Sequence, residues 1–256
     1  MSKSKSSDTS EKYNDPNFDY TKYWVGREYE NAAEEIAIRR LLRGKHFKSA
    51  VDIGGGYGRL CPLLEQYSDK VTLAEPSTKQ LTIAKRFLVN HKKIKLVKLN
   101  SEKYNFADES VDLLTMVRVM HHLPDPNPEF SELSRILKSD GYLVLEIANS
   151  VHFLNRIRSL LKVRKVSEDP IDIRSRKNRN SEVIPFVNHN PKTVIKDLSH
   201  HGLKVEKILS VSNLRIPALK KIVPTSALLS IEKISQPILA KSFFGPSIFL
   251  LVKKAK

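Results

Sequence analysis

Short apolar runs rich in β-branched residues alternate along the chain with segments whose apolar positions recur at helical spacing. Runs of the first kind are typical of buried strands, and segments of the second kind are typical of helices that bury one face. The expected strands cover residues 48–53, 70–74, 94–99, 111–116 and 142–148, and the expected helices cover about 27–42, 59–67, 77–88 and 127–137. This alternation predicts a parallel α/β sheet with helices on both faces.

Two further strands, at residues 204–212 and 247–252, are expected to close the sheet as an antiparallel pair. A helix that begins at Asn190-Pro191 and ends at Gly202 precedes them. The prediction is therefore a seven-stranded, doubly wound, mostly parallel sheet with an antiparallel last strand.

The first strand runs directly into a glycine-rich turn, residues 54–58, with a helix expected from Arg59. Glycines permit positive φ and let a ligand lie against bare backbone, while the free N–H groups at the start of a helix face that ligand. Such a unit binds nucleotide-like cofactors. The dinucleotide frame G-x-G-x-x-G does not fit, because Arg59 stands at its third glycine position.

Two acids indicate which cofactor the turn binds. Asp52 lies just before the turn, where a carboxylate suits an ammonium and a sulfonium better than a pyrophosphate. Glu75 ends the next strand, 19 residues after Gly56, which is the separation expected of an acid that binds a ribose. S-adenosylmethionine (SAM) carries all three groups, and we expect it to be the cofactor.

Three features of the sequence belong together: VDIGGGYG at residues 51–58, Glu75, and NSEKYNFADESVDLLTMVRVMHHL at residues 100–123. They resemble the motifs of class I SAM-dependent methyltransferases of the methyltransferase-type-11 group. The resemblance covers about residues 48–149. It implies a Rossmann-like fold and cofactor contacts at the carboxyl ends of the parallel strands. The implied cofactor-binding residues are Asp52, Gly54, Gly55, Gly56, Glu75, Asn100, Ser101, Glu102, Val117 and Arg27.

Some of these assignments come from the resemblance alone. Residues 100–102 stand where this family holds adenine, although many relatives have an acid at the position of Asn100. The end of the strand at 111–116, with Met116, Val117 and Arg118, is expected beneath the methionine part of SAM. An N-terminal lid covers the cofactor in similar methyltransferases, which makes Tyr23, Trp24 and Arg27 candidates for that role, with Arg27 near the cofactor carboxylate. The alternative is that these aromatic residues pack the helix at 27–42 onto the sheet.

Three histidines are candidates for a catalytic base. His121 and His122 follow the strand at 111–116, and His189 lies further along the chain. Imidazole is suited to proton transfer near neutral pH. A structural or cofactor-pocket role for these histidines is the alternative that we favour, because position in a fold does not fix function.

The expected organisation has five parts. They are a disordered tail at 1–12, an N-terminal lid and helix at 13–47, the SAM-binding core at 48–150, a basic cap insertion at 151–189, and the end of the sheet at 190–256. The last part contains a second cap insertion at about 214–244, with apolar positions at Leu228, Ile231 and Ile238. We expect both insertions to form a substrate cap.

Charge is distributed unevenly along the chain. Residues 1–150 carry 23 Lys and Arg against 21 Asp and Glu, whereas residues 151–256 carry 21 against 7. This excess favours an acidic partner, namely an anionic lipid surface, a phosphorylated or otherwise acidic small molecule, or nucleic acid. General solubility explains the lysines equally well. The oligomeric state cannot be read from the sequence.

Composition limits the class of protein further. One cysteine, Cys61, excludes a disulfide framework and a Cys-based zinc site, and we predict no metal site. No apolar run approaches 18 residues, and the polar N-terminus lacks a signal-peptide core. These features predict a cytoplasmic protein that touches a membrane at most from its surface.

The predicted reaction is in-line transfer of the SAM methyl group to an O, C or N atom of a small-molecule or lipid-like acceptor. The sequence lacks the Asn-Pro-Pro-Tyr-type tetrapeptide after the strand at 111–116, which argues against amino-group methylation of bases. Two alternatives stay open. One is an RNA methyltransferase that uses the basic C-terminal half, and the other is a non-catalytic SAM-fold binding protein.

Overall fold

The computed structural model describes residues 10–100, 103–161, 163, 167–175, 178 and 184–255. The strands of the main sheet are β1 (Phe47–Ile53), β2 (Ser68–Glu75), β3 (Ile94–Lys98), β4 (Val111–Met116), β5 (Leu137–Ala148), β8 (Leu203–Val211) and β9 (Ser247–Lys254). A separate antiparallel pair joins β6 (Ile171–Asp172) to β7 (Val187–Asn188). The α-helices are α1 (Ser10–Asn14), α2 (Glu28–Leu41), α3 (Cys61–Leu64), α4 (Thr78–Phe87), α5 (Asn127–Ile136), α6 (Phe153–Leu161), α8 (Pro191–His200), α9 (Pro217–Ile222) and α10 (Thr225–Ile238). Short 3-10 helices are η1 (Tyr20–Trp24), η2 (Met120–His122) and η3 (Ala240–Ser242).

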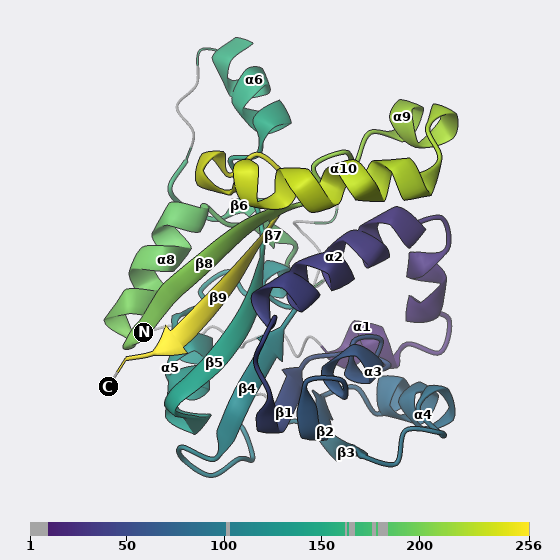
Figure 1. The fold of residues 1–256 in the computed structure, drawn as a ribbon, viewed down its shortest axis with the longest axis vertical. Coiled ribbons are helices and arrows are strands. Elements are labelled where there is room, and N and C mark those ends of the chain that lie inside the picture. Colours follow the sequence, from purple (N-terminus) through teal and green to yellow (C-terminus); the bar gives the residue numbers. More distant parts are fainter. Residues whose placement is uncertain are drawn as a thin grey trace.

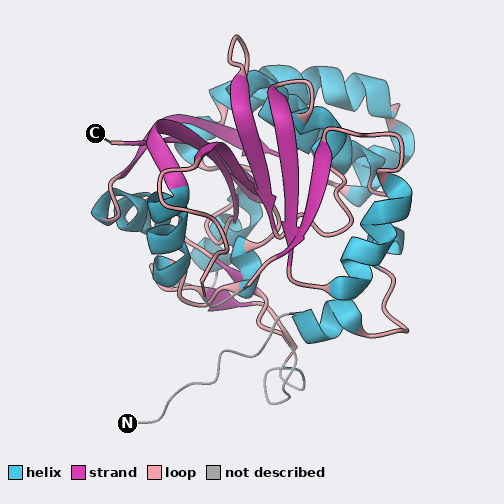
Figure 2. Ribbon diagram, turned by 90° about the horizontal axis from the view of Figure 1, so that it is seen from below, coloured by secondary structure: helices cyan, strands magenta, loops and turns pink. Residues whose placement is uncertain are grey.

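The main sheet has seven strands in the order β3-β2-β1-β4-β5-β9-β8. Strands β1 to β5 pair in parallel, and β9 is antiparallel to both β5 and β8. Figures 1 and 2 show the twisted sheet with helices on both sides. The predicted fold class is confirmed. The chain order reverses between β1 and β4, which is where open α/β sheets bind their ligands.

Both faces of the sheet are buried because neighbouring residues of a strand contact different helices. Leu113 packs in the cluster formed with α2, α3 and α4, whereas Leu114 packs in the cluster formed with α5 and α8. Strands of this kind have nearly continuous apolar sequences, and the run at 142–148 is interrupted only by Glu146.

Three local predictions were wrong. The helix after the glycine turn was expected over 59–67, but α3 covers only Cys61–Leu64. The helical spacing of apolar residues at 77–88 predicts that Phe87 lies on the buried face with Leu81 and Ala84, but Phe87 is 49% exposed. Residues 10–12, assigned to the disordered tail, belong to helix α1, while residues 1–9 lie outside the described residues.

The insertion at 214–244 forms α9, α10 and η3. Helix α10 packs along α2 and against β8, so this part of the chain extends the helical layer on one face of the sheet. A role of both insertions in covering a substrate stays a prediction. Among the residues that the structure describes, no helix is both long enough and apolar enough to cross a bilayer.

Candidate active site

The glycine turn lies at the switch point of the sheet, between β1 and the segment that follows β4. Gly54 has φ +65°, and a Cβ atom built on it would lie 2.7 Å from Cγ2 of Val119. Gly56 has φ +61°, and its Cβ would lie 3.1 Å from the ring of Tyr20. Side chains at these two positions would therefore be strained and would also fill the space above the turn.

Glu75 closes the turn from the end of β2. Its Oε2 accepts a hydrogen bond from the Gly56 N–H at 2.9 Å, and its Oε1 accepts one from the Ser77 N–H at 2.8 Å. The side chain is nearly inaccessible, and burial raises the pKa of Glu75 to about 7 although both N–H groups oppose this shift. The spacing argument that singled out Glu75 thus located a carboxylate that is bonded to the turn itself.

Asp52 lies beneath the turn rather than in the cavity above it. A Cβ on Gly55 would lie 2.2 Å from Oδ2 of Asp52, and Oδ1 accepts a hydrogen bond from Oγ1 of Thr115 at 2.6 Å. Burial raises the pKa of Asp52 to about 6. In the structure Asp52 therefore supports the turn, and a direct contact with a cofactor stays a prediction. Cys61, 3.9 Å from Asp52, is fully buried as a packed thiol.

A cavity opens above the turn. It is lined by Tyr13, Tyr20, Gly54, Gly56, Glu75, Pro76, Arg118, Val119, His122 and Leu123. Its roof comes from the N-terminal segment, which is tied down over α4. The Nζ of Lys79 donates to the carbonyl oxygens of Asp15, Pro16 and Phe18, and Oγ of Ser77 donates to that of Tyr13. The N-terminal segment thus does cover the site, as the resemblance implied.

The lid residues in contact with the cavity are not those predicted. Tyr13 and Tyr20 line it, whereas Tyr23 and Trp24 lie against guanidinium groups behind it. Arg27 stacks on the ring of Tyr23 at 4.2 Å and lines a separate groove, so the structure does not place it beside the turn. The aromatic composition of residues 13–29 was the available signal, but it could not tell which rings face the site.

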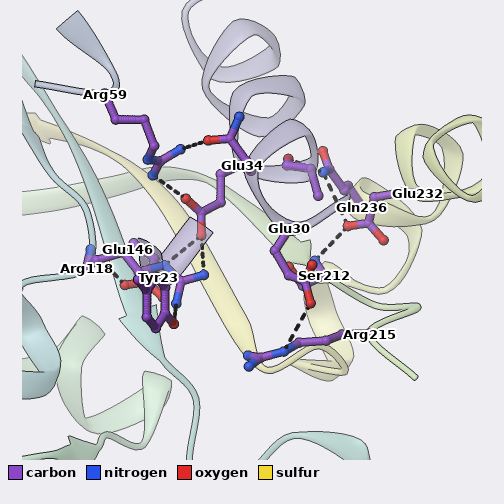
Figure 3. Close-up of polar contacts among 12 residues, drawn as sticks. Tyr23, Glu30, Glu34, Arg59, Arg118, Glu146, Ser212, Arg215, Glu232 and Gln236 are labelled. Atoms are coloured by element: carbon purple, nitrogen blue, oxygen red, sulfur yellow. Dashed lines mark hydrogen bonds and ion pairs between the residues drawn. The ribbon is translucent and has the colours of Figure 1, made fainter. Parts of the chain in front are cut away.

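Arg118 is the cation that lines the cavity. The resemblance had placed it with Met116 and Val117 beneath the methionine part of SAM, without a role for its charge. It follows β4 with φ +63°, an uncommon conformation for a residue other than glycine, and its N–H donates to Glu146 at 3.2 Å. Its guanidinium donates to the buried Glu34 at 2.8 Å and to the hydroxyl of Tyr23 at 3.1 Å. Figure 3 shows Glu34 between Arg118 and Arg59, so that α2 fixes both arginines beside the turn.

The three candidate histidines occupy different environments. His122 lines the cavity, and its Nε2 lies 2.8 Å from the Tyr13 hydroxyl while its Nδ1 lies 3.0 Å from the carbonyl oxygen of Pro185. His121 packs its ring against those of His122 and Phe186. His189 is buried, with Nε2 3.0 Å from the carbonyl oxygen of Met120. Burial lowers the pKa of all three, to about 4 for His122.

The other predicted contacts are less well placed. Val117 is buried in the core cluster with α2, and Val119 lines the cavity instead. Asn100 is exposed at the end of β3 and does not line the cavity. Ser101 and Glu102 lie outside the described residues.

The strand order, the glycine turn at the switch point and the acid at the end of β2 together define the Rossmann-like architecture of class I SAM-dependent methyltransferases. Comparison with known proteins makes this specific. Residues 51–145 match the protein family described as "Methyltransferase domain". This part of the chain is a SAM-dependent methyltransferase domain.

Curated relatives resemble the same part of the chain. A "Ubiquinone biosynthesis O-methyltransferase" of Nitrosomonas europaea is 27% identical over 118 residues, which are 44% of this chain and 48% of the relative. A "Ubiquinone/menaquinone biosynthesis C-methyltransferase UbiE" of Hahella chejuensis is 30% identical over 107 residues, or 39% and 43% of the two chains. The chain thus spans about half the length of the curated relatives it matches.

Solved structures share the fold across most of the chain. A putative S-adenosylmethionine-dependent methyltransferase from Listeria monocytogenes superposes with a TM-score of 0.61 at 15% identity, covering 89% of this chain and 99% of that one. A putative methyltransferase of Haloferax volcanii, in complex with the Trm112 methyltransferase activator, gives a TM-score of 0.60 at 15% identity over 92% and 93% of the chains.

Proposed function

We propose that the protein transfers the methyl group of SAM to an O or C atom of a small, apolar or lipid-like acceptor. The hydrogen bond between the Gly56 N–H and Glu75 carries this proposal, because it places a carboxylate and bare backbone in one cavity at the switch point. The names of the relatives, which include O- and C-methyltransferases of quinone biosynthesis, support this choice of acceptor atoms.

The residues present fit SAM. Gly54 and Gly56 leave the turn without side chains, Glu75 offers acceptor oxygens for ribose hydroxyls, and Arg118 offers a cation for the cofactor carboxylate. When bound, SAM supplies a methyl group that its sulfonium already activates. The protein then contributes orientation and exclusion of water, which the N-terminal segment over the turn provides.

His122 is the histidine best placed to accept a proton. The carbonyl oxygen of Pro185 can only accept a hydrogen bond, so the proton of the neutral ring is on Nδ1 and the lone pair of Nε2 faces Tyr13. The low pKa of His122 keeps the ring neutral at pH 7, at some cost in basicity. Burial raises the pKa of Tyr13, so its hydroxyl stays protonated and donates to His122. A phenolic acceptor would replace the Tyr13 hydroxyl as this donor.

The acceptor side of the cavity is largely apolar. Tyr13, Tyr20, Pro76, Val119 and Leu123 contribute rings and aliphatic groups. Such a lining suits a flat, apolar molecule more than a charged one. Phenols and quinols of increasing tail length are therefore the first acceptors to test.

Calorimetric titration with SAM and S-adenosylhomocysteine tests the cofactor site. Glu75→Ala should weaken binding of both ligands about 100-fold, since it removes the two charge-assisted hydrogen bonds that Glu75 would accept from the ribose hydroxyls. Asp69→Ala is the matched control, because Asp69 is an exposed acid at the opposite end of the same strand. A folded wild-type protein that binds neither ligand would overturn the proposal.

Turnover with phenolic acceptors tests the base. His122→Gln should leave SAM affinity unchanged and lower kcat about 10²-fold or more, whereas His121→Gln should have a smaller effect. Equal losses in the two variants would contradict the assignment of His122.

A further inference from the structure

Exposed apolar side chains gather in the C-terminal part of the chain. Of the 16 large hydrophobic side chains that are exposed among the described residues, 13 belong to residues 151–256. Exposed apolar side chains that gather in one region mark an interaction site more often than singly scattered ones do. Helices α6, α9 and α10 carry most of these residues and lie together at the upper end of the molecule in Figure 1.

Helix α10 docks on the protein through polar side chains. The carboxylate of Glu232, fully buried, accepts hydrogen bonds from the N–H groups of Ser212 and Asn213 and from the Tyr29 hydroxyl, at 2.6 to 3.0 Å. Gln236 donates to the carbonyl oxygen of Ala33 at 2.9 Å. These bonds fix the rotation of the helix about its axis.

As a consequence, the apolar stripe of α10 faces solvent. Ala227, Ile231, Ile234 and Ile238 recur at helical spacing on the outer side, and the three isoleucines are 51%, 65% and 69% exposed. Leu228, Ile231 and Ile238 were the apolar positions expected in the cap. Leu228 is buried and Leu229 packs against the core, whereas Ile231 and Ile238 are exposed. The buried face of α10 thus combines Leu228 with the polar Glu232 and Gln236. The three isoleucines lie on the solvent side, where an ordinary surface helix carries mainly polar residues.

Helix α6 adds a second exposed apolar face. Its apolar residues, Phe153, Leu154, Ile157, Leu160 and Leu161, fall on one side of the helix and are all exposed. The ring of Phe153 stacks on that of Phe244 with centroids 4.7 Å apart, which fastens the start of α6 beside the end of α10 and η3. We call the outer faces of α6 and α10 the α6/α10 surface.

The charge around this surface is one-sided. Helices α6, α9 and α10, all of whose residues are described, carry no exposed acidic side chain, because their one acid is the buried Glu232. Next to α9, four cations line a groove: Arg27, Arg215, Lys220 and Lys221. Glu30 pairs with Arg215 and Lys220, so the groove keeps a positive excess.

We propose that the α6/α10 surface docks onto an anionic membrane surface. The isoleucines and leucines would enter the acyl–headgroup boundary, and the cations of the α9 groove would meet lipid phosphates. A second copy of the chain fits less well, because it would bring two strongly basic halves together. Nucleic acid would match the charge but would leave the apolar stripes in water. This inference is independent of the proposed methyl transfer.

Co-sedimentation of the full chain with vesicles tests the proposal. Vesicles of phosphatidylcholine with about one third phosphatidylglycerol should bind the protein, and vesicles of phosphatidylcholine alone should bind it much more weakly. Added salt should weaken binding without abolishing it, since the apolar contribution is not screened. Ile234→Glu should reduce binding at least about tenfold, because it removes an isoleucine that would enter the bilayer and adds a negative charge that anionic lipid repels.

Val89→Glu is the matched control: Val89 is 71% exposed but follows α4, away from the α6/α10 surface. Leu160→Glu in α6, 79% exposed, tests the second helix and serves if Ile234→Glu does not fold. SAM titration and circular dichroism verify that each variant is intact.

Several results would overturn the inference. One is a wild-type protein that ignores anionic vesicles, and another is equal binding by Ile234→Glu, Leu160→Glu and Val89→Glu. Retention on RNA with steep salt dependence and without vesicle binding would assign the charge to nucleic acid. A dimer in analytical ultracentrifugation that Ile234→Glu dissociates, again without vesicle binding, would assign the surface to a second copy.

Discussion

Glu34 is the carboxylate on which the cation of the active-site cavity depends. It lies in the middle of α2 with no exposed surface, and it pairs with Arg118 and Arg59, each only 12% exposed. Burial alone would raise the pKa of Glu34, but the two guanidinium groups outweigh it and lower the pKa. Replacing Glu34 with alanine therefore leaves two buried cations without their shared partner (Figure 3).

The expected cost is about 3–5 kcal/mol, which is the cost of breaking a buried ion pair by removing one partner. This is a large part of a total stability of roughly 5–15 kcal/mol. With a urea m-value of about 3 kcal/mol/M, the unfolding midpoint should fall by about 1–1.7 M. Glu35→Ala is the control, because Glu35 is the next residue of α2, is only partly buried, and accepts one hydrogen bond from Asn31. It should change stability by about 0.5 kcal/mol or less.

The dependence on pH gives a second readout. Because the folded state lowers the pKa of Glu34, its stabilisation is present above the unfolded value near 4.3 and disappears as pH falls through the folded value. The difference in unfolding free energy between wild type and Glu34→Ala should therefore be constant from pH 8 to 6 and should become smaller below about pH 4. Two results would refute this account of the network. One is a loss of unfolding free energy below about 1 kcal/mol in Glu34→Ala, and the other is a difference from wild type that stays the same in acid.

Three further predictions concern the turn and its acids. With the pKa of Glu75 raised to about 7, SAM should bind about tenfold more weakly at pH 6 than at pH 8 if the carboxylate form binds, and a flat calorimetric profile would contradict this. Asp52→Asn should raise the free energy of unfolding at pH 8 by roughly 2–3 kcal/mol. With a pKa of about 6 in the folded state, ionised Asp52 destabilises the fold increasingly as pH rises. Urea titrations should show that this gain vanishes near pH 4. Gly54→Ala should lower the free energy of unfolding by about 1–2 kcal/mol more than Gly44→Ala does. Both glycines have positive φ, but of the two only Gly54 is crowded, by Val119. Equal urea unfolding midpoints for the two variants would argue against crowding.

The strands, the glycine turn and Glu75 followed from the sequence because their signals are local. Short runs rich in apolar residues, a glycine run and a 19-residue separation all lie within a single strand–helix–strand unit. The order of the sheet then places the turn and Glu75 together, as any right-handed parallel crossover would. Asp52 was identified by the same reasoning, but its position under Gly55 depended on packing against Thr115.

Only the tertiary structure determined the contacts between segments that are far apart in the chain. Arg118 faces the cavity because Glu34, 84 residues earlier, holds its guanidinium. Tyr13 reaches His122 across 109 residues, whereas Tyr23 and Trp24, just as aromatic, lie behind the arginines. Helix α10 turns its isoleucines outward because Glu232 finds its hydrogen-bond donors on β8's end and on α2. Periodicity shows that a helix has two faces, but the partners of its buried polar groups determine which face is inside.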